Sequence, residues 1–249
     1  MNLENALRQR VSSVAGIKAV TFDLDDTFWP VWPAVGRAEQ AMMVWLQKYA
    51  PRIVEQFGVD GLRDLRDQIA KQKPDLDYHI SLIRILAMRE AAEAAGYAPE
   101  IGEQAFEVMW LERNRVDLYD DVMPMLTDIK ELKLMIGALS NGNADVKQVG
   151  LGAWFDFSLN AISGGGPKPG EAMFRKAAGL AQCQTGQIVH VGDDLRSDVA
   201  GAAAAGMITV WLNREVDGSG SNPADFEISS LQELPAILRE LLSLSAVSE

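Results

Sequence analysis

The sequence predicts an α/β protein in which helices cover a parallel sheet and an all-helical unit is inserted after the first strand. Two observations support this fold class. Short apolar segments alternate with helical patterns through the second half of the chain, as in parallel strands joined by right-handed crossovers. Roughly one hundred residues without a convincing strand separate the first strand from the second, which is far longer than an ordinary loop.

Five segments are expected to form buried strands, because each is a short apolar run bounded by Gly, Asp or Asn. They are residues 17–24, 134–143, 155–163, 187–194 and 207–213. Apolar residues at helical spacing predict helices over 122–132, 174–181, 195–206 and 234–242. The segment DGSGSNPA, residues 217–224, is expected to be a loose loop.

The long segment after the first strand contains its own helical patterns. Apolar residues repeat at helical spacing over 38–49, and further helices are expected over 61–72, 78–95 and 100–116. Pro51, Pro74, Gly96 and Pro99 supply the breaks between them. We therefore expect a helical cap domain at 32–116, inserted into a catalytic core made of residues 1–31 and 117–249.

Composition excludes several classes of partner. The 249 residues are 48% apolar and carry a formal net charge of -12, so nucleic acid and anionic membranes would be repelled. Charged residues interrupt residues 3–20, which leaves no apolar run long enough for a signal peptide or a membrane span. We expect a cytoplasmic protein that acts on a small molecule. The sequence leaves its oligomeric state open.

Polar side chains follow the expected strands where each one ends. Asp23 and Asp25 end the first strand, and residues two apart in a strand face the same side, so both can reach one site. The carboxyl ends of parallel strands line the ligand crevice of such sheets, which predicts that the later strands contribute to the same rim. Their polar residues are Ser140, Asn141, Lys168, Asp193, Asp194 and Asp198.

These residue types suit the hydrolysis of a phosphate monoester. Asp23 can attack phosphorus and form an aspartyl phosphate. A hard divalent cation, held by Asp23, Asp193 and a backbone carbonyl, would remove the repulsion between carboxylate and phosphate. Lys168 and Ser140 would bind phosphoryl oxygens, with Asn141 as a further substrate-binding residue. Asp25 would protonate the leaving group and later activate water.

The motifs DLDDT, LSNGN, KP and HVGDDLRSDVAGAAAAGM follow one another in this order. Together they resemble the motif series of the haloacid dehalogenase (HAD) superfamily of phosphatases, over roughly residues 18–213. The resemblance implies a Rossmann-like core, a helical cap that closes over the active site, and Mg²⁺. It also implies Asp23 as nucleophile, the backbone carbonyl of Asp25 and the side chain of Asp193 as Mg²⁺ ligands, and Ser140 and Lys168 as phosphate binders.

A narrower resemblance concerns the substrate. The segments TFDLDDT, NGNA, LGAWFDF and IVHVGDDLRSDVAGA are similar to bacterial flavin mononucleotide phosphatases that also act on the ribitylamino-uracil phosphate of riboflavin synthesis. This implies flavin mononucleotide or a riboflavin-pathway phosphate as substrate. Another sugar or nucleotide phosphate is the alternative.

Several residues carry two interpretations. Asp198 can join the metal shell with Asp23, Asp25 and Asp193, or it can orient Lys168. Asp194 is expected to cap the helix near Leu195, with a metal role as the alternative.

The remaining residues with two interpretations are a histidine, a turn residue and two tryptophans. His190 is expected to be a core histidine whose ring is hydrogen-bonded, and Asp26 a turn residue. Trp29 and Trp32 follow the catalytic strand, where they either stack on a flat substrate ring or pack the hinge.

Rival functions remain in view. A dehalogenase would use Asp23 on a carbon–halogen bond and would need neither a leaving-group acid nor a metal, so Asp25 and Asp193 argue against it. A receiver-like signalling domain also places acids, a hydroxyl and a lysine around Mg²⁺. The paired Asp23 and Asp25 and the inserted cap disfavour that interpretation.

Overall fold

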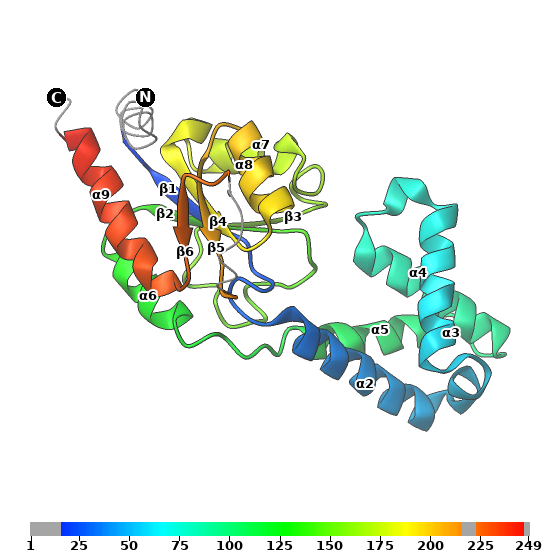
Figure 1. Cartoon of the computed structure of the whole chain (residues 1–249). Coiled ribbons are helices and arrows are strands. Elements are labelled where there is room, and N and C mark those ends of the chain that lie inside the picture. Colours follow the sequence, from blue (N-terminus) through cyan, green and yellow to red (C-terminus); the bar gives the residue numbers. More distant parts are fainter. Residues whose placement is uncertain (1–15, 216–222, 247–249) are drawn as a thin grey trace. The chain divides into compact units, whose positions relative to one another are not determined.

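A computed structural model describes residues 16–215 and 223–246 of the chain. Two compact units compose the chain (Figure 1). The first comprises Met1–Trp29, Leu118–Asn141 and Gly150–Glu249, and the second comprises Pro30–Asp117 and Gly142–Val149. The sequence prediction placed the whole of residues 142–149 in the first unit, whereas the structure groups this segment with the helices.

The first unit is built on a six-stranded parallel sheet. The strands are β1 (Ala19–Phe22), β2 (Met135–Ser140), β3 (Phe157–Asn160), β4 (Ile188–Gly192), β5 (Ile208–Leu212) and β6 (Phe226–Ile228). Their order is β3-β2-β1-β4-β5-β6, so β1 pairs with both β2 and β4. The direction of winding reverses beside β1, and in open α/β sheets the ligand crevice lies at such a switch point. The expected Rossmann-like fold is confirmed.

Helices cover both faces of this sheet. They are α6 (Val122–Lys130), α7 (Glu171–Leu180), the π-helical turn η3 (Leu195–Ala200), α8 (Gly201–Ala204) and α9 (Leu234–Ala246). Figure 1 shows α7 and α8 on one face and α6 and α9 on the other. The single helix expected over 195–206 is divided between η3 and α8. The short 3-10 turns η2 (Thr185–Gln187) and η4 (Leu231–Glu233) precede β4 and α9.

The sequence prediction missed β6. This strand has only three residues, with an exposed Glu227 between Phe226 and Ile228, so it lacks the apolar run that marks the other strands. Most of the expected loop at 217–224, residues 217–222, lies outside the described part of the chain.

The second unit is a helical bundle. It contains α2 (Val31–Tyr49), α3 (Pro51–Gln72), the 3-10 turn η1 (Pro74–Leu76), α4 (Ile80–Ala94) and α5 (Glu100–Arg113). Pro51 opens α3 ten residues before the expected start at 61, and Gly58, with a φ of 58° and a ψ of -167°, is not helical, so α3 consists of two helical segments that meet at a kink.

A separate hydrophobic core holds this bundle together. Buried side chains from all four α-helices pack against one another, among them Met42, Leu62, Met88 and Met109. Among the described residues, no helix is both long enough and apolar enough to cross a membrane.

Candidate active site

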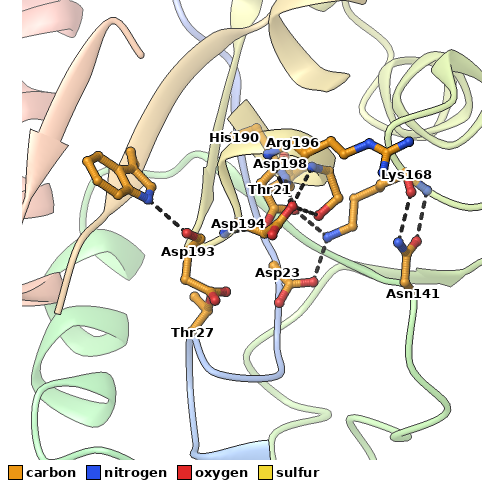
Figure 2. Close-up of polar contacts among 12 residues, drawn as sticks. Thr21, Asp23, Thr27, Asn141, Lys168, His190, Asp193, Asp194, Arg196 and Asp198 are labelled. Atoms are coloured by element: carbon orange, nitrogen blue, oxygen red, sulfur yellow. Dashed lines mark hydrogen bonds and ion pairs between the residues drawn. The ribbon is translucent and has the colours of Figure 1, made fainter. Parts of the chain in front are cut away.

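The polar side chains at the rim come from separate strand ends of the first unit (Figure 2). Asp23 directly follows β1, Ser140 is the last residue of β2, and Asp193 directly follows β4. The three strands are hydrogen-bonded neighbours, so their carboxyl ends lie at one edge of the sheet. Lys168 and Asp198 complete the group from the segment before α7 and from η3.

Lys168 lies between two carboxylates. Its Nζ donates to Asp23 Oδ1 at 2.5 Å and to Asp198 Oδ1 at 2.6 Å, and the lysine is only 3% exposed. A buried ammonium is stable only when it is paired and hydrogen-bonded. The two ion pairs therefore fix Lys168 against the expected nucleophile, and they agree with the interpretation in which Asp198 orients this lysine.

Burial and mutual repulsion shift the titration of these groups. Burial raises the pKa of Asp23 well above its usual range, although the Lys168 ammonium opposes this. Burial, with repulsion from Asp198, likewise raises the pKa of Asp193 to about 6. Burial would also raise the pKa of Asp198, but Lys168 and His190 outweigh it and lower that pKa to about 2. Burial lowers the pKa of Lys168, and the two paired carboxylates more than reverse this.

The donor set fits a divalent cation. Carboxylate oxygens of Asp23, Asp193 and Asp198 lie within 4.8 Å of one another. Two of these acids pair with Lys168, so the group has an excess of two negative charges when all three are ionised. Oxygen ligands suit a hard cation such as Mg²⁺. Burial is the main cause of the raised pKa values of Asp23 and Asp193, and repulsion between the acids adds to it.

The three acids are not equivalent as ligands. Asp198 Oδ1 already contacts Lys168 and His190 Nε2, and its Oδ2 accepts from the backbone N–H of Asp194 at 3.2 Å. Asp23 Oδ2 accepts no hydrogen bond from a described residue. The side chain of Asp25, one of the expected metal residues, is not part of the acidic group.

Asp25 has a different neighbour. Trp29 Nε1 donates to its Oδ1 at 2.8 Å across a tight turn in which Asp26 has a φ of 59°. Asp26 is therefore a turn residue, as expected. The Trp29 ring is fully buried and packs edge-on against Phe28, so it offers no open face for a flavin, and the packing interpretation is favoured over substrate stacking. Trp32 is 76% exposed.

Asn141 holds the backbone of Lys168. Its Oδ1 accepts from the Lys168 N–H at 2.8 Å and its Nδ2 donates to the Lys168 carbonyl at 2.9 Å (Figure 2). Both ends of the amide are thus engaged within the chain. Asn141 thus positions Lys168, and its expected role in substrate binding stays a prediction. Ser140 lies beside it and is buried at the end of β2.

Two residues with open interpretations have well-defined contacts. Asp194 Oδ1 accepts from the N–H groups of Arg196 and Ser197, which confirms it as the N-cap of η3. His190 is buried, with Nδ1 2.9 Å from Thr21 Oγ1 and Nε2 3.2 Å from Asp198 Oδ1. The histidine is a core residue that also holds Asp198 in place.

The sequence analysis missed the residues that hold Asp193. Thr27 Oγ1 donates to Asp193 Oδ1 at 3.0 Å, and Trp211 Nε1 donates to the Asp193 carbonyl at 2.8 Å. Thr27 belongs to the DLDDT motif, so the motif contained its signal. Arg214 donates to the Thr27 carbonyl and to the Asp121 carboxylate. Arg214 and Asp121 are 93 residues apart, so no local sequence pattern predicts their contact.

Comparison with known proteins gives the family. The family model for haloacid dehalogenase-like hydrolases matches residues 17–206. The 5-amino-6-(5-phospho-D-ribitylamino)uracil phosphatase YigB of Escherichia coli is 32% identical over 80% of this chain and 84% of its own length. A phosphoserine phosphatase of Thermus thermophilus is 37% identical over 57% of each chain.

Solved structures agree with this result. The crystal structure of a 2-haloacid dehalogenase from Pseudomonas syringae pv. Tomato superimposes with a TM-score of 0.84 at 36% identity, over 90% of this chain and 99% of that one. The HAD-hydrolase YfnB of Bacillus subtilis shares the fold at 17% identity with a TM-score of 0.61. The chain therefore belongs to the haloacid dehalogenase-like hydrolases, and it is a phosphoric monoester hydrolase.

Proposed function

We propose that the protein is a Mg²⁺-dependent phosphatase that hydrolyses a small phosphate monoester through an aspartyl phosphate on Asp23. The observation that carries this proposal is the buried contact of Lys168 with Asp23, beside Asp193. A carboxylate nucleophile, a fixed cation and a group of acids with excess negative charge are the parts that such a reaction needs.

The reaction takes place in two displacements. Asp23 attacks phosphorus while the bond from phosphorus to the ester oxygen breaks, and Asp25 donates a proton to that oxygen. A water molecule then gives its proton to Asp25 and attacks the aspartyl phosphate, which releases inorganic phosphate and restores Asp23. Trp29 supports this exchange of protons, because its Nε1 contact holds the Asp25 carboxylate in one orientation.

Asp23 and Asp193 would hold Mg²⁺, with the backbone carbonyl of Asp25 as the ligand that the family resemblance implies. When bound, the ion supplies positive charge that offsets the repulsion between carboxylate and phosphate. Lys168 neutralises a phosphoryl oxygen, while Asn141 and Asp198 keep its backbone and ammonium in place.

A riboflavin-pathway phosphate is the substrate that we propose. The relative in E. coli is named for its action on 5-amino-6-(5-phospho-D-ribitylamino)uracil, and 80% of this chain aligns with it. The sequence segments similar to flavin mononucleotide phosphatases point to the same chemical class, a flat heterocycle on a ribityl phosphate.

A panel of phosphate esters tests the proposal. It contains flavin mononucleotide, the ribitylamino-uracil phosphate and phosphoserine, each assayed with Mg²⁺ and with EDTA. We expect Mg²⁺-dependent phosphate release, fastest with a ribityl phosphate, and none from the Asp23→Asn variant. Equal rates with phosphoserine would refute the proposed substrate class, and full activity in EDTA would refute the metal.

Dehalogenation is a second candidate, because the solved 2-haloacid dehalogenase is 36% identical over 90% of this chain. Chloride release from 2-chloropropionate measures it directly. We expect no chloride release, because Lys168 and the proposed metal ligands Asp23 and Asp193 are suited to binding a phosphoryl group.

A further inference from the structure

A second site lies wholly within the helical unit. Residues of the helices α2, α3, α4 and α5 line a pocket that opens to solvent. Its wall is mostly apolar and rich in methionine. The apolar residues are Met42, Met43, Val59, Leu62, Ala87, Met88 and Met109.

The charged residues of the pocket are unbalanced. Arg63, Arg66 and Arg84 line it together with a single acid, Glu39. This local excess of positive charge stands in a chain whose net charge is -12. Arg63 is held by Glu39 at 2.6 Å, and Arg66 by Asp67 at 2.8 Å.

Arg84 differs from its neighbours. Within the part of the chain that the structure describes, it makes no ion pair or hydrogen bond. Burial lowers the pKa of Arg84, the positive charges of Arg66 and Arg113 lower it further, and only Glu39 opposes this. Folding thus places a partly desolvated guanidinium near like charges, and only the charge of Glu39 offsets part of the cost.

We propose that this pocket binds a small organic anion whose carboxylate or phosphate is held by Arg84 and whose apolar body lies against the methionines. A guanidinium binds such oxyanions in a bidentate manner, and methionine side chains adapt to irregular apolar shapes. An apolar wall with a few convergent polar groups is typical of small-molecule sites. The proposal goes beyond catalysis, since none of the expected catalytic residues lines the pocket.

The test uses 8-anilinonaphthalene-1-sulfonate, which joins an anionic group to an apolar body and fluoresces when bound in apolar surroundings. The full chain should bind it saturably at one site, and its uncharged analogue N-phenyl-1-naphthylamine should bind about tenfold more weakly, the loss of one charge-assisted hydrogen bond. Equal affinity for the two dyes in the natural protein would overturn the proposal without any variant.

Variants locate the site. Arg84→Gln should weaken dye binding about tenfold, the scale of one charge-assisted contact, while its thermal unfolding midpoint stays equal or rises because an uncompensated charge is removed. Arg84→Lys keeps the charge and should retain most of the binding. Arg89→Gln is the matched control on the same helix, because Arg89 pairs with Glu103 outside the pocket and should bind the dye normally.

Two outcomes would sink the proposal: unchanged binding by Arg84→Gln, or equal losses in Arg84→Gln and Arg89→Gln. Flavin mononucleotide added to the dye complex then identifies the source of the anion. Displacement assigns the pocket to the substrate, and unchanged fluorescence assigns it to a separate ligand. Because the readout is binding, the result is independent of whether the proposed phosphatase reaction is correct.

Discussion

The rim of the sheet has an excess of negative charge, and the pocket of the helical unit has an excess of positive charge. At the rim, Lys168 is the partner of two of three clustered carboxylates, whereas in the pocket three arginines share the lining with one acid, Glu39. Each imbalance costs stability unless a ligand of the opposite sign binds. The net charge of -12 does not predict the local charge of either region. The rim would bind a cation, and the pocket would bind an anion.

The two regions also differ in how firmly they are built. The rim groups are fixed by short mutual contacts at the ends of buried strands, as with Lys168 between Asp23 and Asp198. The pocket is lined by flexible methionines, and Arg84 has no fixed partner among the described residues. Rigid geometry suits bond breaking, which demands fixed distances, while an adaptable wall suits binding.

The largest effect should follow from the nucleophile. Asp23→Asn removes the carboxylate that attacks phosphorus and should lower kcat by about 10⁴-fold or more, as for other essential nucleophiles. Phosphate release measures this loss. Asp26→Asn is the control, since Asp26 occupies a left-handed turn that asparagine also accepts, and its activity should be almost unchanged. Comparable rates for the two variants would remove Asp23 from the mechanism.

Removal of the Lys168 ammonium should increase the excess of negative charge at the rim. Lys168→Met leaves the buried carboxylates of Asp23 and Asp198 without their cation and should lower the free energy of unfolding by about 3–5 kcal/mol in EDTA. Added Mg²⁺ should restore part of this loss, because it supplies the missing charge. Urea unfolding of this variant and of the exposed-site control Lys176→Met measures both effects. If Mg²⁺ stabilises the two variants equally, the proposed charge deficit is wrong.

The contact of Asp121 with Arg214, which also holds the backbone of Thr27, makes stability depend on pH. Burial would raise the pKa of Asp121, but hydrogen bonds from Arg214, the Leu231 N–H and Ser230 outweigh it and lower that pKa. A lowered folded-state pKa means that the stabilisation is complete above the unfolded pKa of about 4 and is lost as pH falls through the lower, folded value.

Asp121→Asn should therefore reduce the free energy of unfolding by about 2–3 kcal/mol at pH 7, and the deficit should shrink below about pH 4. Urea unfolding at several pH values provides the comparison, with the exposed Asp120→Asn as control. A deficit that stays constant down to pH 3 would contradict the assignment.

The smallest effect should come from Trp29. Trp29→Phe keeps a buried ring but loses the hydrogen bond to Asp25, so kcat should fall about 5- to 10-fold, the scale of one such contact, and its pH profile should shift while KM stays constant. A rise in KM for flavin mononucleotide alone would instead support stacking on this ring. Trp110→Phe, on the helical unit, is the control.

Much of the fold could be predicted from local pattern. Apolar runs predicted β1 to β5, because buried parallel strands need continuous apolar sequence. The geometry of a parallel sheet brings Asp23 and Asp193 together at the strand ends, whereas Lys168 reaches Asp23 from the segment before α7. The three-residue β6 carried too little signal, and nothing local assigned residues 142–149 to the helical unit.

Side-chain partners were harder to predict than positions. Asn141 lies at the expected edge of the sheet, and its side-chain amide holds the backbone of Lys168. This contact depends on how the segments that carry the two residues pack, and the spacing of residues in the sequence does not predict that packing. Arg214 and Asp121 are joined across 93 residues. The arginines of the pocket belong to two helices, and only packing brings their side chains to one cavity.

Titration calorimetry with Mg²⁺ tests the central claim most directly. The natural protein should bind one ion, Asp193→Asn should lose that binding, and Asp194→Asn should keep it, because Asp194 caps η3 and its carboxylate lies outside the acidic group. Equal Mg²⁺ binding by all three proteins, or loss in the Asp194 variant alone, would contradict a metal site formed by Asp23 and Asp193.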